Sequence, residues 1–121
     1  MTATASRAPS PMLPLGFLII AALAFVLAGL ALPWLAGDLA GHYYHPRILA
    51  LAHTLTLGWI TLTIMGASYQ LIPIVLERPV WSERLARWEL GLMALGVIGI
   101  VGHAAIAAWS PAAARISFTW S

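Results

Sequence analysis

Residues 48–73 read ILALAHTLTLGWITLTIMGASYQLIP, a run without Asp, Glu, Lys or Arg. A helix needs about 20 predominantly apolar residues to cross a bilayer, so this run is long enough to do so. It also contains an imidazole, that of His53. Ionisable groups inside membrane segments are costly and usually functional, and imidazole nitrogen is a common metal ligand. The run therefore predicts a membrane-spanning helix that carries a candidate metal ligand, His53, roughly two turns below one membrane surface.

The composition extends this prediction to the whole chain. Of the 121 residues, 61% are hydrophobic and 8% are charged, whereas a soluble domain has about 25% charged residues. We therefore expect an all-α integral membrane protein in which residues 1–121 form a single transmembrane domain. The net charge of +2 is too small to indicate nucleic-acid binding. The chain has no cysteine, which excludes disulfides, thiolate metal sites, iron–sulfur clusters and covalently attached c-type haem.

The apolar runs predict three transmembrane helices in an antiparallel bundle, at about residues 15–35, 46–76 and 83–110. Pro14 suits the first position of the first helix, because an N–H there would be unpaired anyway. Pro73 is expected to bend or end the second helix. Ser82 is a candidate N-cap for the third helix, and Glu83 is favourable in its first turn. A signal peptide is the alternative for the first run, but the run exceeds the about 7–15 apolar residues of a signal core.

The arginines predict the orientation of the bundle. With three crossings, the N-terminus and the second loop share a side, which carries Arg7, Arg78, Arg84 and Arg87. The other side carries Arg47 and Arg115. Because positive residues favour the cytoplasmic side, we expect the N-terminus in the cytoplasm.

Two histidines are predicted to lie at equal depth. His53 is about seven residues into the second helix and His103 about seven residues before the end of the third, so both lie roughly 10 Å below the outer surface. They could be the two axial ligands of a haem, and both are candidate metal ligands. Gly96 and Gly99 share a helix face with His103. Glycines there leave room for a flat macrocycle or for another helix. Of these two interpretations we favour ordinary helix packing.

Other interpretations of the polar residues stay open. His53 could instead form a hydrogen bond with a neighbouring helix or with nearby threonines. Arg47 could pair with haem propionates, or it could mark the water boundary. His42 and His45 could bind a metal, but they lack a third ligand, and an interfacial loop is the favoured interpretation.

Residues 53–73 resemble helix II of subunit I in the haem–copper oxidase superfamily, in particular the nitric oxide reductase and cbb3-type branch. In that family a histidine near the outer end of helix II is followed by a Gly-Ala-x-Tyr pattern and a proline at the inner end. This chain has His53, then Gly66-Ala67-Ser68-Tyr69, then Pro73. The resemblance spans roughly residues 41–103, and it implies that His53 is an axial ligand of a low-spin haem.

The family has many more crossings than the three expected here. Its second low-spin haem ligand, its copper-binding histidines and its high-spin haem ligand lie on later helices. The resemblance therefore implies no complete catalytic site in this chain, which is at most a subunit of an oxidoreductase. The second axial ligand is then His103 or a residue of another chain, or the haem has been lost.

We therefore expect a b-type haem-binding electron-transfer protein, or a subunit of a larger respiratory complex, in the bacterial inner membrane. Its expected partners are the lipid bilayer and either other membrane subunits or further copies of itself. The alternative from another class is a structural subunit that binds no cofactor or binds a pigment. A lone membrane histidine can also ligate the magnesium of a chlorophyll.

Overall fold

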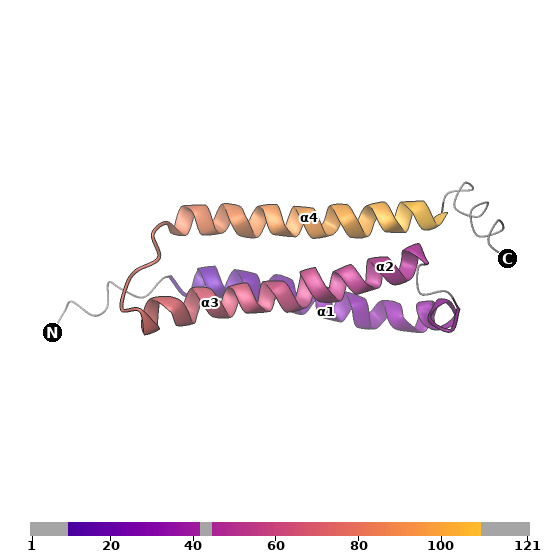
Figure 1. Cartoon of the computed structure of the whole chain (residues 1–121), viewed down its shortest axis with the longest axis horizontal. Coiled ribbons are helices and arrows are strands. Elements are labelled where there is room, and N and C mark those ends of the chain that lie inside the picture. The colour runs from indigo at the N-terminus through magenta and orange to yellow at the C-terminus, as the bar shows by residue number, and fades with distance from the viewer. Residues whose placement is uncertain (1–9, 42–44, 110–121) are drawn as a thin grey trace.

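The structure, a computed structural model, describes residues 10–41 and 45–109, and this part of the chain is helical without strands. Helix α1 (Met12–Leu39) is followed by a loop and then by three segments in direct succession: α2 (Pro46–His53), the π-helix η1 (Thr54–Thr61) and α3 (Leu62–Val75). Helix α4 (Glu83–Trp109) runs back along them (Figure 1). The predicted all-α antiparallel bundle is confirmed.

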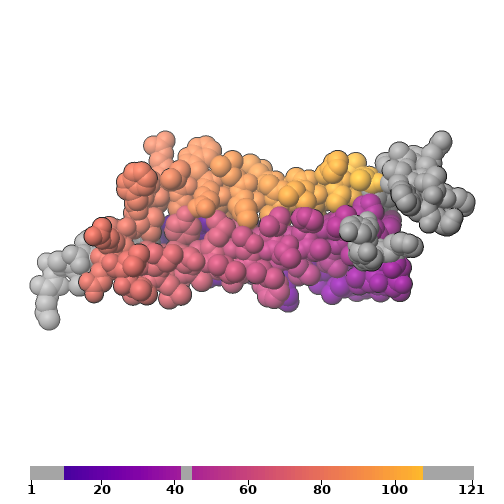
Figure 2. Space-filling model, in the orientation of Figure 1, coloured from indigo at the N-terminus to yellow at the C-terminus, as the bar shows by residue number. Residues whose placement is uncertain are grey.

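Each of the three crossings has the length and composition of a membrane span. The candidate spans are Met12–Leu39, Pro46–Val75 and Glu83–Ala107, with 28, 30 and 25 residues. We call Pro46–Val75 the second span. Figure 2 shows one elongated body in which α4 lies along the second span. The chain is therefore a multi-pass membrane protein with most of its surface formed by apolar helix.

Helix α1 begins earlier than predicted. It starts at Met12, with Pro11 in the cap position, so Pro14 lies at the third helical position and not at the first. Proline is compatible with this site because the first four N–H groups of a helix have no partner within the helix. Pro14 is also buried against the bundle, so it serves packing as well as the start of the helix.

The second span ends two residues after Pro73, so this proline lies inside the last turn of α3. The backbone N–H of Arg78 donates to the Pro73 carbonyl (3.2 Å), and that of Glu77 donates to the Ile74 carbonyl (3.4 Å). These two bonds form a Schellman motif, which ends a helix by placing one residue in the left-handed conformation. That residue is Glu77, with a φ of 53°. The helix therefore ends close to Pro73 as expected, and the hydrogen bonds that end it come from Glu77 and Arg78.

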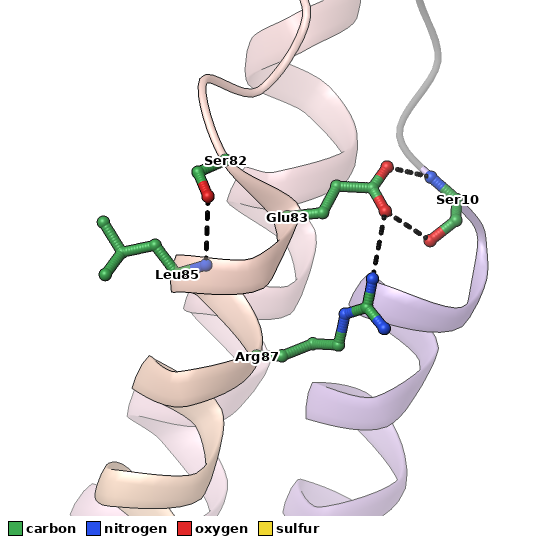
Figure 3. Close-up of polar contacts among 5 residues, drawn as sticks. All are labelled: Ser10, Ser82, Glu83, Leu85 and Arg87. Atoms are coloured by element: carbon green, nitrogen blue, oxygen red, sulfur yellow. Dashed lines mark hydrogen bonds and ion pairs between the residues drawn. The ribbon is translucent and has the colours of Figure 1, made fainter.

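The start of α4 is capped as predicted and is also joined to α1. The Ser82 hydroxyl accepts a hydrogen bond from the Leu85 backbone N–H (3.2 Å). The Glu83 carboxylate accepts hydrogen bonds from the backbone N–H of Ser10 (2.9 Å) and from its hydroxyl (3.1 Å). Glu83 also lies 3.8 Å from the Arg87 guanidinium (Figure 3). This end of the bundle is therefore held by polar contacts between the N-termini of two helices.

The buried core is small and lies near the same end. Its members come from α1, α3 and α4: Leu13, Phe17, Ala21, Leu62 and Ala86. Most large apolar side chains instead face outward. On α4 alone, Leu92, Leu95, Ile98 and Ile106 are each 65–73% exposed. Such a surface is suited to lipid, because lipid tails are as apolar as leucine.

Candidate functional site

His53 is the last residue of α2, seven residues after Pro46, which places it about 10 Å along the helix from its start. Its Nδ1 lies 2.7 Å from the carbonyl oxygen of Leu49, one turn earlier. A carbonyl oxygen only accepts hydrogen bonds, so Nδ1 carries a proton, and in the neutral imidazole Nε2 then keeps its lone pair. Within residues 10–41 and 45–109, no hydrogen-bond partner is found for Nε2. The imidazole is thus fixed at one nitrogen and has the other available to a ligand.

The backbone changes geometry directly after His53. Residues Thr54–Thr61 form a π-helix, and the Thr61 hydroxyl donates to the carbonyl of Thr56, five residues earlier (2.9 Å). π-Helical turns are rare and frequently occur at functional sites. The hydroxyls of Thr54 and Thr56 each donate to a carbonyl four residues earlier (2.8 Å). The threonines considered as partners of His53 therefore bond to their own helix instead.

His103 lies six residues before the end of α4, about 9 Å along the helix, so the two histidines are at similar depth. Its surroundings differ from those of His53. Val101 and Ala105 line a cavity between the helices, and His103, which is exposed, does not line it. At about 100° per residue, His103 points about 160° away from both of these neighbours. The structure therefore directs His103 away from the second span, and pairing with His53 inside one bundle would require α4 to rotate.

The glycines predicted to flank His103 share its face of the helix. Gly96 and Gly99 are exposed, and a Cβ atom built on either would meet nothing within 4 Å. Gly99 and His103 therefore belong to one open surface of α4 that no described part of the chain covers. Their predicted role in binding a cofactor stays a prediction.

Arg47 lies in the first turn of α2 and bridges to the end of α1. Its Nη1 is 3.2 Å from the Asp38 carboxylate, and the two side chains are 40% and 24% exposed. Arg47 also lines the cavity between α1, α2 and α4, which His53 does not line. Its pairing with a haem propionate stays a prediction.

Of the two loop histidines, the structure describes His45. The His45 side chain caps α2, because its Nδ1 accepts a hydrogen bond from the Arg47 backbone N–H (3.4 Å). His42 lies outside the described residues. Among residues 10–41 and 45–109, no group of three or more His, Asp or Glu side chains is placed to hold a metal ion.

A polar pair that the sequence analysis did not predict joins the second span to α4. The Tyr69 hydroxyl donates to the Glu89 carboxylate, and the Tyr69 ring stacks on Phe17 with ring centroids 5.3 Å apart. Glu89 lies six residues into α4, about 9 Å from its start. Tyr69 lies six residues before the end of α3, at matching depth on an antiparallel helix. That match in depth is the sequence signal that could have revealed the pair.

Comparisons of the chain with protein-family models, with curated proteins and with solved structures found no match. The resemblance to helix II of the oxidases therefore stays an expectation from the sequence. Function has to be argued from the geometry of the bundle.

Proposed function

We propose that this chain binds a b-type haem in the membrane through His53 and acts in electron transfer, alone or as a subunit of a larger redox complex. One observation carries the proposal. The Leu49 carbonyl accepts a hydrogen bond from Nδ1 of His53, which in the neutral imidazole leaves the Nε2 lone pair available. Metal-bound histidines usually donate their other ring N–H to a carbonyl or carboxylate, which fixes the tautomer and the ring orientation. Any haem would be held without covalent bonds, because the sequence has no cysteine.

His53 is the residue that would hold the haem iron. His53 would supply one ligand nitrogen, and the Leu49 carbonyl would orient the ring. The apolar helices would exclude water from the site. A bound haem iron would supply one-electron chemistry, and its axial ligands would influence the reduction potential. The outward direction of His103 favours a second ligand that comes from another chain, including another copy of this one.

An optical spectrum of the purified protein tests this proposal. We expect a reducible Soret band and α-band, and His53→Ala should abolish the haem or convert a six-coordinate low-spin spectrum into a high-spin one. His103→Ala on α4 is the variant that identifies the second ligand. If His103 is the second ligand, this variant should show the same loss, and if the ligand lies on a different protein, its spectrum should be unchanged. An unaltered haem spectrum in His53→Ala would remove the central claim.

The open face of α4 favours a second candidate function. A structural subunit would pack this face against other membrane helices, because glycines allow backbones to approach closely. Such a subunit would bind no cofactor, or would hold a pigment through His53. Far-red absorbance of the purified protein would indicate a pigment, and the absence of both far-red and haem bands would indicate a scaffold. Either result would replace the haem proposal.

For the orientation, we propose a cytoplasmic N-terminus in the bacterial inner membrane. The support is the arginine bias, together with the Ser10–Glu83 contacts that join the start of α1 to the start of α4. Single cysteines at Ser82 and Gly41 test it with an impermeant thiol reagent added to whole cells. Labelling at Gly41 but not at Ser82 is expected, and the reverse pattern would show the opposite orientation.

A further inference from the structure

A cavity of about 280 Å³ lies between α1, α2 and α4 at the end of the bundle where Arg47 meets Asp38. Ten residues line it, nine of them from these three helices and one, Thr54, from the start of η1. They are Leu27, Ala28, Ala31, Leu35, Arg47, Ala50, Leu51, Thr54, Val101 and Ala105. His53 does not line this cavity, so an inference about it does not depend on the haem proposal.

The walls of the cavity are apolar. Eight of the ten lining residues are Ala, Val or Leu, and the four alanines leave space that larger side chains would fill. Thr54 is one of the two polar residues, and its hydroxyl donates to the carbonyl of Ala50 (2.8 Å). Away from Arg47 the lining side chains offer no free donor, and an apolar space of this kind stays dry in general. Inside a bilayer, the acyl chain of a lipid is the group available to fill such a space.

Arg47 is the second polar lining residue, and it provides a cation at the membrane-surface end of the cavity. A guanidinium has five N–H donors in a fork that matches phosphate and carboxylate. The structure pairs one of its nitrogens, Nη1, with Asp38, and within the described residues no other side-chain partner of Arg47 is found. Donors therefore remain for an acidic group beside the opening.

We propose that this cavity binds a lipid with an acidic headgroup, whose acyl chain lies between α1, α2 and α4 and whose phosphate pairs with Arg47. The tail alone gives little preference, because a chain that leaves the bilayer for the cavity moves between two apolar surroundings. The headgroup therefore sets the selectivity. A single arginine near the membrane surface favours an anionic lipid by up to about fivefold, which equals about 1 kcal/mol, and the Asp38 carboxylate reduces this for Arg47.

Native mass spectrometry of the full chain in mild detergent tests the proposal. Phosphatidylglycerol and phosphatidylcholine with identical acyl chains are titrated in turn. The wild-type chain should prefer phosphatidylglycerol by up to about fivefold, and Arg47→Gln should abolish that preference. Asp38→Asn should raise it, because the variant removes a carboxylate that competes for the guanidinium. Arg84→Gln is the matched control, since it makes the same charge change at the other end of the bundle, and the preference should persist.

Ala31→Leu separates the acyl chain from the headgroup. A larger side chain in the wall should reduce phosphatidylglycerol binding, while circular dichroism shows unchanged helix content. Glycerol phosphate, which lacks acyl chains, should not compete. Equal binding of the two lipids by the wild-type chain, or an equal loss in Arg47→Gln and Arg84→Gln, would overturn the proposal. So would unchanged binding in a folded Ala31→Leu chain, or competition by glycerol phosphate, which would indicate a free-anion site.

Discussion

The second span and α4 use glycine in opposite ways. A Cβ atom on Gly58 would lie 2.9 Å from the Ala24 Cβ, and one on Gly66 would lie 2.9 Å from the Phe17 Cβ. On α4, a Cβ on Gly96 or Gly99 would meet nothing within 4 Å. The glycines of the second span are thus needed for its contact with α1. Those of α4 form a surface that is still open to lipid or to another helix.

The two membrane histidines follow the same division. His53, on the second span, has one ring nitrogen fixed by the Leu49 carbonyl. His103, on α4, is exposed on the open side of its helix. One span therefore holds its polar group in a defined orientation, and the other presents its polar group outward. Substitutions on the second span should therefore affect the stability of the bundle, and substitutions on the open face of α4 should affect binding to a partner.

Gly66→Ala should have the largest effect on stability. The added methyl group would approach Phe17, the Pro14 carbonyl oxygen at 3.2 Å and Leu18 at 3.3 Å, so α1 must shift. Overpacking of this kind costs about 1–3 kcal/mol. Gly99→Ala is the matched control and should leave the free energy of unfolding unchanged or raise it by up to about 1 kcal/mol, because alanine favours helix more than glycine does. Unfolding in mixed detergent micelles measures both, and equal effects would contradict the distinction.

Gly58→Ala should have a smaller effect, which depends on the residue at position 24. Its new methyl group would meet the Ala24 Cβ at 2.9 Å and the Val97 Cγ1 at 3.4 Å. We expect a loss near the lower end of the about 1–3 kcal/mol typical of overpacking. Ala24→Gly removes the closest atom, so the losses of the two single variants should add to more than the loss of the double variant. Additive losses in the double-mutant cycle would show that the α1–η1 contact is not this close.

Much of this fold could be predicted from the sequence because each boundary has a local cause. The third helix begins at Glu83 as predicted, since the Ser82 hydroxyl provides the cap. The second begins at Pro46 as predicted, and its end near Pro73 follows from the backbone restrictions of proline. Helix α1 is longer than predicted at both ends. The composition shows where the apolar run begins and ends, but it does not show how far helical hydrogen bonding continues beyond that run.

The site was less predictable because it depends on direction as well as depth. The rise per residue gave similar depths for His53 and His103, but the face of α4 that packs inward depends on contacts between distant residues. The π-helix Thr54–Thr61 also has no evident local signal. Nothing in its residue types predicts backbone hydrogen bonds between residues five apart, as in a π-helix, in place of four apart, as in an α-helix. The Tyr69–Glu89 pair needed the register of two antiparallel helices.

Tyr69→Phe should have a modest effect on the attachment of α4 to the second span. The variant keeps the ring that stacks on Phe17 but removes the hydroxyl that donates to Glu89. Hydrogen bonds between membrane helices contribute about 0.6 kcal/mol on average and at most about 1.7 kcal/mol. Glu89→Gln is the control, because a glutamine can still accept the hydrogen bond. A loss in Tyr69→Phe well above this range would mean that the pair organises more than one contact.

His103→Ala should have the smallest effect on the isolated bundle. The side chain is exposed on a face that the described residues do not cover, and surface substitutions usually change stability by less than about 0.5 kcal/mol. The same variant should act differently if the open face of α4 meets another helix in the membrane. It should then weaken the association of chains, measured by energy transfer between labelled copies in vesicles, and Gly99→Leu should weaken it further by keeping the backbones apart. If the isolated His103→Ala chain lost much of its stability, His103 would have to pack inside the bundle. The proposed difference between the second span and α4 would then be wrong.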